Sequence, residues 1–334
     1  MSRLFRQSGG VWPNLLAILY TVLGWLLGIW MLTRPEVVLN VLGVLLTAHA
    51  LVYSGYLIHE CAHSAVFTSA RANDRLGLAM SWINGACIAS YGRLKMKHLR
   101  HHADRLDVVT FDYRAALNHC PAWVRRVVLV LEWAYVPVIE LLMRGMVIAM
   151  PFGEADVRAR ARVIAVLAVR IALLVALALI SVKAVVLYAL AWLLFVTVLR
   201  FMDAFQHTYE VFPSRSLAPA PVDPRRDRRY EYENTYSNLV SERRWWLNLL
   251  VMNFTYHNAH HVRPGAPWYR LPALHRSLYG EADRQVIPCR ELFMSYHRHR
   301  MARVLAENYG SVALTGARAS GFLGAVGVSF LTAM

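Results

Sequence analysis

The chain has 334 residues, of which 57% are hydrophobic and 17% charged, and its mean hydropathy is +0.35. Its apolar residues come in long blocks, which excludes a pair of ordinary soluble domains and predicts one membrane domain with a cytosolic face. The formal net charge of +15 lies in the segments between the apolar blocks, and no nucleic-acid-binding motif accompanies it, so we expect no nucleic acid partner. By the positive-inside rule, these basic segments face the cytoplasm beside anionic lipid.

Four apolar blocks are long enough to cross a hydrocarbon core about 30 Å thick. They lie at about residues 15–32, 37–58, 163–180 and 185–205. Short connections join the first block to the second and the third to the fourth, so we expect two helical hairpins. The chain is therefore predicted to be an all-α membrane protein, a single integral-membrane domain over residues 1–306. The tail, residues 307–334, is apolar and rich in Gly and Ala, and its order is left open.

Two further apolar stretches do not suit a simple span. Residues 76–91 are short and interrupted by glycine, which favours a re-entrant or interfacial segment. Residues 127–150 carry Glu132, Glu140 and Arg144, which are costly at mid-bilayer, so we expect a helix lying in the interface, with a tilted span as the alternative. The segments at about 59–126 and 213–306 should form a cytosolic helical lobe.

Three histidine clusters follow these blocks: HECAH at 59–63, HLRHH at 98–102 and HNAHH at 257–261. Residues three and four apart share a face of a helix, so each cluster is predicted to aim its imidazoles at one point, as metal ligands do. His207 follows the last block, four residues after Asp203, and is expected to share a helix face with it. The predicted ligands are His59, His63, His98, His101, His102, His207, His257, His260 and His261. Nine imidazoles are too many for one ion and enough for two, although imidazole suits iron, zinc and copper alike.

This arrangement resembles the membrane-bound fatty-acid desaturase family, whose three histidine boxes follow transmembrane hairpins and hold a di-iron centre. The resemblance covers roughly residues 15–275, and the third box with its extension to Pro272 is especially similar to bacterial members. It implies two Fe ions as cofactor, O2 as co-substrate, and a fatty acid or acyl thioester as substrate. The HxxxH spacing of the first box is shorter than in animal acyl-CoA desaturases, and Ser64 stands where many acyl-lipid members have a histidine.

Desaturation of a long fatty acyl chain is the expected reaction. The bacterial branch includes terminal-alkene-forming fatty-acid decarboxylases, so oxidative decarboxylation is an alternative, as is hydroxylation or ketolation of an apolar substrate. HExxH is also the signature of zinc proteases, with Glu60 as general base, but an intramembrane zinc protease leaves the other boxes unexplained. A metal- or haem-handling protein without catalytic activity is a further alternative.

The reduction of dioxygen needs an external electron donor, because the chain has no HPGG haem motif and its four cysteines are scattered. We expect a ferredoxin-like or cytochrome partner, and a location in the bacterial inner membrane with the active site facing the cytoplasm.

Acidic residues near the boxes are candidates to fix the orientation of the ligating imidazoles. They are Glu60, Asp104, Asp107, Asp203 and Glu210. Arg100 and Arg263 are candidates to bind a substrate carboxylate or headgroup, with membrane-surface contact as the alternative.

Overall fold

The computed structural model describes residues 4–154, 156–213, 222–280, 285–313 and 318–333. The chain divides into two compact units. Unit 1 takes in Met1–Lys95, Arg144–Val198 and Leu331–Ala333, and unit 2 takes in Met96–Met143 and Leu199–Phe330. Helices α4, α7 and α9 contribute residues to both.

Unit 1 consists of long apolar helices and one broken segment. Its elements are η1 (Ser8–Gly10), α1 (Val11–Leu32), α2 (Val37–Ala62), α3 (Ala70–Asn84), η2 (Ala86–Ile88), the first turn of α4 (Tyr91–Asp104), the end of α7 (Val138–Gly153), α8 (Val157–Ile180) and most of α9 (Val182–Ala204). Among the described residues, four helices are long and apolar enough to span a membrane: Ser8–Leu32, Val37–Ala62, Val157–Ile180 and Val182–Ala204. The predicted class, an all-α membrane protein with about four spans, is confirmed.

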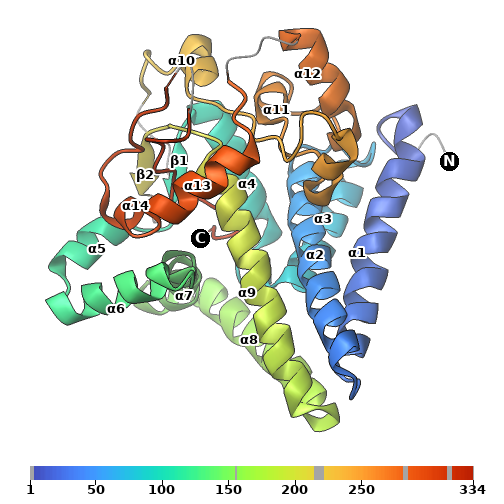
Figure 1. Ribbon diagram of the computed structural model, residues 1–334. Helices are drawn as coiled ribbons and strands as arrows, with labels where there is room; N and C mark the ends of the chain where they lie inside the picture. The colour runs from blue at the N-terminus through green and yellow to red at the C-terminus, as the bar shows by residue number, and fades with distance from the viewer. Residues whose placement is uncertain (1–3, 155, 214–221, 281–284, 314–317, 334) are drawn as a thin grey trace. The chain divides into compact units, whose positions relative to one another are not determined.

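Small residues let α1 and α2 pack closely as an antiparallel pair (Figure 1). A Cβ atom on Gly28 would lie 2.3 Å from the Thr47 hydroxyl, so only glycine fits there. The core beside this contact joins Leu32 and Val44 to Ala184 and Tyr188. Most of α8, in contrast, is exposed apolar surface, as a helix facing lipid should be.

The broken segment from α3 to η2 covers the stretch predicted to be re-entrant or interfacial. Arginine side chains from α8 satisfy its carbonyl groups. Arg170 donates to the Trp82 carbonyl at 2.7 Å, and Arg162 donates to the carbonyls of Cys87, Ile88 and Ala89 at 2.9, 3.2 and 3.1 Å. A helix end that lacks intrahelical partners needs such donors wherever water is scarce. The segment is not one of the four candidate spans, and its re-entrant placement stays a prediction.

The expectation of one helix over residues 127–150 is wrong. The stretch forms two helices, α6 (Ala122–Trp133) and α7, separated at Ala134–Pro137, where Tyr135 has a φ of 62°. Pro137 explains the break, because proline disfavours helical backbone in the residue before it and cannot donate a helical hydrogen bond.

Unit 2 consists of short elements connected by long loops. Its elements are the rest of α4, β1 (Asp107–Val109), α5 (Tyr113–His119), α6, the start of α7, the end of α9, β2 (Val211–Pro213), α10 (Arg228–Glu233), η3 (Trp245–Val251), α11 (His257–Val262), η4 (Trp268–Arg270), α12 (Leu271–Tyr279), α13 (Cys289–His299) and α14 (Ala302–Leu305). Strands β1 and β2 pair in parallel, with Asp107 opposite Val211. The pairing brings the end of the second histidine box beside the segment that carries His207.

The buried acidic residues of α6 and α7 share one arginine partner inside unit 2. The guanidinium of Arg200 lies 2.6 Å from the Glu132 carboxylate and 3.1 Å from that of Glu140. All three side chains are almost fully buried. The cost that makes such residues rare in lipid is therefore offset by ion pairing within the protein.

The last residues of the chain contribute to the core of unit 2. Phe322 is fully buried in a cluster with Phe205 and Tyr296, and Val326 packs with Ile139. Residues 307–313 and 318–330 are therefore a structural component of unit 2.

Candidate metal centre

Seven histidines of unit 2 converge in two groups. We call His98, His102 and His260 group A, and His101, His207, His257 and His261 group B. In each group the ligand nitrogens lie within 4.8 Å of one another. Only the residues that the structure describes enter these groups.

The second and third histidine boxes are each split between the groups. On α4, His98 and His102 are four residues apart and both join group A, while His101 joins group B. On α11 the pattern is reversed, because His257 and His261 join group B and His260 joins group A. The prediction that each box aims its imidazoles at one point is therefore wrong for the second and third boxes, whereas His59 and His63 of the first box fall in one candidate ligand group, as predicted. The second and third boxes therefore each supply histidines to both group A and group B.

The nitrogens of group A are spaced as ligands of one ion. The Nε2 atoms of His98 and His102 are 3.2 Å apart, and those of His102 and His260 are 3.1 Å apart. Metal–imidazole bonds of about 2.1 Å place neighbouring ligand nitrogens about 3.0 to 3.4 Å apart. The observed spacing fits a shared ion.

Group B is centred on His207, with one nitrogen–nitrogen distance in the same range and one shorter. The Nε2 of His207 lies 2.7 Å from Nε2 of His257 and 3.1 Å from Nε2 of His101. His207 is placed by an antiparallel bridge with Thr235, and its ring stacks on Tyr209 at a centroid distance of 4.2 Å.

Hydrogen bonds at the opposite ring nitrogen orient two ligands of group B. The Nδ1 of His101 lies 2.9 Å from the Leu106 carbonyl, which can only accept, so Nδ1 carries the proton and Nε2 presents a lone pair. The Nδ1 of His261 lies 3.1 Å from the Glu231 carboxylate, which favours the same tautomer. Lone pairs that converge in this way repel one another unless a cation lies between them, and we infer that both groups fit metal ions.

Burial also keeps two of the group B imidazoles, His207 and His257, neutral. The pKa of His207 lies well below its usual value, first because the ring is buried and then because His261, His101 and His257 lie close to it. The pKa of His257 is lowered for the same reasons. Neutral imidazole is the form that binds a metal.

The first box lies in unit 1, at the end of α2. His59 is buried in the last turn, His63 is the residue that follows the helix, and their ring centroids are 4.8 Å apart. The buried carboxylate of Glu60 lies 4.0 Å from Nδ1 of His59. The expected pairing of two imidazoles with an acidic neighbour is present within this unit.

The helical argument for His207 and Asp203 is wrong, although His207 does join the site. Helix α9 ends at Ala204, so the two residues are not on successive turns of one helix. Burial lowers the pKa of the Lys97 ammonium to about 7, and the nearby carboxylates of Asp107 and Asp203 oppose this shift. Lys97 also donates to the Ser329 carbonyl at 2.9 Å.

The other predicted acidic residues differ in their surroundings. Asp107 lies 3.4 Å from Nδ1 of His101, as a residue that orients a ligand should. Asp104, predicted to orient a ligand, forms an ion pair at 2.5 Å with Arg100, predicted to bind substrate. The two predicted residues therefore pair with each other. Glu210 is exposed and lines a separate hollow with Asp223, and its role beside the histidines stays a prediction.

Glu231 is a functional candidate that the sequence did not indicate. One carboxylate oxygen accepts from His261 and the other lies 3.1 Å from Arg105, which also donates to the Arg226 carbonyl. No box or short spacing marks Glu231, because it lies 30 residues before its histidine. Arg263, predicted to bind substrate, is exposed at the end of α11, and its role stays a prediction.

A comparison with models of known families gives a match over most of the chain. The model of the family described as fatty acid desaturase matches residues 36–293, about three quarters of the chain. The matched region contains all three boxes and His207. A search of curated proteins found no match.

Proposed function

Because the chain belongs to the fatty acid desaturase family, we propose that it oxidises a long fatty acyl chain with two iron ions and dioxygen, and that the reaction is desaturation. The observation that carries this proposal is the division of seven histidines into two groups, each with the spacing of ligands around one ion. A pair of irons would supply an oxidant strong enough for an unactivated C–H bond, which side-chain acids and bases cannot attack.

The ligands that we propose are the seven histidines of groups A and B together with His59 and His63 of the first box. The first box is included because of its HxxxH pattern and the family membership. Glu231 holds the ring of His261, and Asp107 and the Leu106 carbonyl hold the ring of His101, in the tautomer that presents Nε2. Such partners preserve the direction of the lone pair and increase the basicity of the ring.

The substrate that we propose is a fatty acid or an acyl thioester, and the electrons come from a ferredoxin-like or cytochrome partner. The formal charge of +15 supports an acidic carrier protein, because complementary charge accelerates the encounter. We place the boxes on the cytoplasmic face of a bacterial inner membrane, since the basic segments surround them. The zinc protease alternative would leave the seven histidines of unit 2 without a role.

Mass spectrometry of lipids and volatiles from cells with and without the expressed chain tests the proposal, with the His257→Ala variant as the matched inactive control. A new internal double bond that depends on His257 supports desaturation. An odd-chain 1-alkene from an even-chain acid, without that double bond, would replace desaturation by decarboxylation. Identical products in all three cultures would contradict an acyl-chain oxidase.

A further inference from the structure

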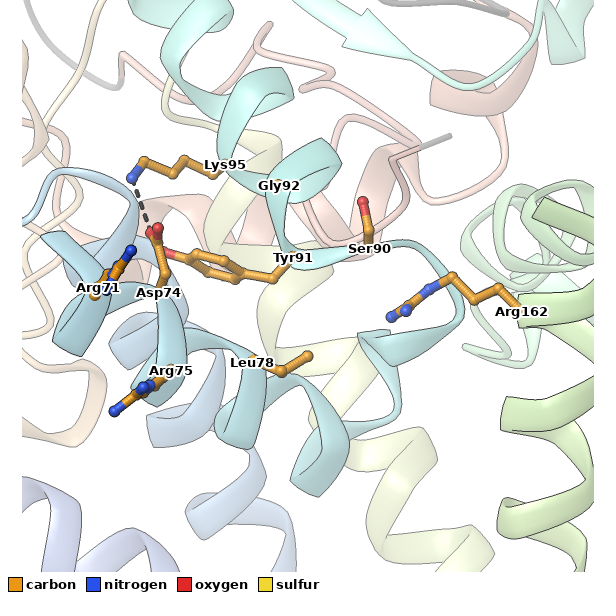
Figure 2. A pocket seen from close by; sticks show the side chains of 9 residues that line it. All are labelled: Arg71, Asp74, Arg75, Leu78, Ser90, Tyr91, Gly92, Lys95 and Arg162. Atoms are coloured by element: carbon orange, nitrogen blue, oxygen red, sulfur yellow. Dashed lines mark hydrogen bonds and ion pairs between the residues drawn. The ribbon is translucent and has the colours of Figure 1, made fainter. Parts of the chain in front are cut away.

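Unit 1 has two hollows on α3 and α8 that belong to neither histidine group. The first, which we call the basic hollow, has a volume of about 520 Å³ and includes Arg71, Arg75, Lys95 and Arg162 in its lining (Figure 2). Arg71 and Arg75 lie on one side of it and Arg162 on the other. The proposed oxidation chemistry uses none of these residues.

The charge of the basic hollow is suited to a phosphate group. Four cations and one carboxylate, Asp74, leave three positive charges. Lys95 is paired with Asp74 at 2.9 Å, whereas Arg71 and Arg75 are exposed and one helical turn apart on α3. Two guanidinium groups at this spacing can both donate to one phosphate, which arginine binds with fork geometry.

The floor of the basic hollow is apolar. The ring of Tyr91 lies against Gly77, where a Cβ atom would come within 2.1 Å of Cε2, and Leu78 lies beside it. A ligand bound here would contact charged side chains such as Arg71 and Arg75, and also the apolar surface of Tyr91 and Leu78. This combination favours an amphiphile over a free inorganic ion.

The second hollow, which we call the apolar hollow, lies further along the same two helices. It has a volume of about 340 Å³, and its lining comes mainly from apolar side chains of α3 and α8, with others from α1 and α9. Arg170, which donates to the Trp82 carbonyl, is the one charged residue among Trp25, Ile29, Trp82, Ile83, Arg170, Leu173, Leu174, Leu177 and Tyr188. From Arg162 to Leu174 the rise of α8 is about 18 Å. That length is close to half the thickness of a bilayer core, about 15 Å, which one acyl chain spans.

We propose that unit 1 binds one anionic phospholipid, with its phosphate in the basic hollow and one acyl chain in the apolar hollow. Arg162 lies near the start of a membrane span, and basic pockets between spans at that depth bind lipid headgroups. The outward side chains of α8, among them Ile164 and Ile171, are exposed and leave the site open to lipid. The lipid site is independent of the proposed oxidation, because no group A or group B residue contributes to it.

The test is native mass spectrometry of the purified full chain, titrated with phosphatidylglycerol and with phosphatidylcholine of the same acyl chains. We expect tighter binding of phosphatidylglycerol. Replacing both arginines in Arg71→Gln/Arg75→Gln should weaken its binding about 30-fold, the change that corresponds to about 1 kcal/mol per arginine at a membrane surface. The Arg290→Gln/Arg298→Gln variant removes the same charge from exposed positions of α13 in unit 2 and should bind as the wild type does.

Two further arms separate the headgroup from the chain. Leu174→Trp fills the apolar hollow and should weaken phosphatidylglycerol at least 10-fold, while Arg71→Lys/Arg75→Lys keeps the charge and should retain most of the binding. Equal binding of the two lipids by the wild type would overturn the proposal. So would binding of palmitoyl-coenzyme A in place of phosphatidylglycerol, which would make the basic hollow a site for carrier phosphates, or displacement of the lipid by inorganic phosphate alone.

Discussion

Units 1 and 2 both hold arginine side chains against other parts of the fold, and the partners of these arginines differ. In unit 1, Arg162 and Arg170 of α8 donate to backbone carbonyls of the broken segment from α3 to η2. In unit 2, Arg200 pairs with two carboxylates, Glu132 and Glu140. The carbonyl partners are neutral, whereas the carboxylates carry charge that must be balanced.

The two kinds of partner predict different costs when an arginine is lost. Losing an arginine in unit 1 leaves unsatisfied carbonyls, but losing one in unit 2 leaves buried negative charge, which costs more. The converging imidazoles of groups A and B are a further case in which polar groups of unit 2 need a cation. Substitutions in unit 2 should therefore have larger effects than matched substitutions in unit 1.

The largest expected effect is loss of activity in His207→Ala, because His207 Nε2 lies 2.7 and 3.1 Å from two other nitrogens of group B. Product formation should fall to background and the iron content should fall with it, while membrane insertion is unchanged. The control is His119→Ala, an exposed histidine outside both groups, which should keep full activity. Full iron and near-normal turnover in His207→Ala would remove this residue from the ligand set.

The next effect concerns stability. Arg200→Met should lower the free energy of unfolding by about 3 to 5 kcal/mol, because two buried carboxylates lose their partner. Thermal or denaturant unfolding in detergent measures the loss. The counterpart in unit 1, Arg162→Gln, should cost about 1 to 3 kcal/mol, the cost of unsatisfied carbonyls. Equal losses in the two variants would contradict the contrast between the units.

Phe322→Ala tests the role of the last residues in unit 2. Removal of a fully buried aromatic ring from the cluster with Phe205 and Tyr296 should cost about 3 to 5 kcal/mol. Unfolding in detergent is again the measurement. The exposed Phe293→Ala is the size-matched control on α13 and should be close to neutral. A neutral Phe322→Ala would show that this segment adds nothing to the fold.

The smallest of these effects distinguishes two glutamates. Glu231→Gln weakens the acceptor of His261 and should lower metal affinity or activity about 10- to 100-fold. Glu210→Gln, at an exposed position, should stay within about twofold of wild type. Iron titration and turnover of both variants show which glutamate orients a ligand. A larger loss in Glu210→Gln than in Glu231→Gln would assign that role to Glu210 instead.

The sequence predicts well what depends on local pattern. Apolar length predicts four spans, and histidine spacing predicts a metal site with Asp107 close to it. It does not predict the split of the second and third boxes, because residues three and four apart share a helix face whichever group each ring joins. It also misses Glu231 and the partner of Glu132 and Glu140, since these contacts join residues that are far apart in the chain.

His207 shows how a correct assignment can rest on an incorrect reason. The four-residue spacing from Asp203 predicted a shared helix face, but α9 ends at Ala204 and a bridge to Thr235 places the imidazole instead. Periodicity cannot locate the end of a helix when no proline or glycine marks it.

The most direct test of the central claim is the metal content of the purified full chain, measured by elemental analysis beside the His101→Ala variant. Two groups of converging imidazoles predict about two irons per chain in the wild type. The variant should lose iron from group B first, since group A keeps His98, His102 and His260. One equivalent of zinc without iron, in a protein that is otherwise intact, would contradict the account.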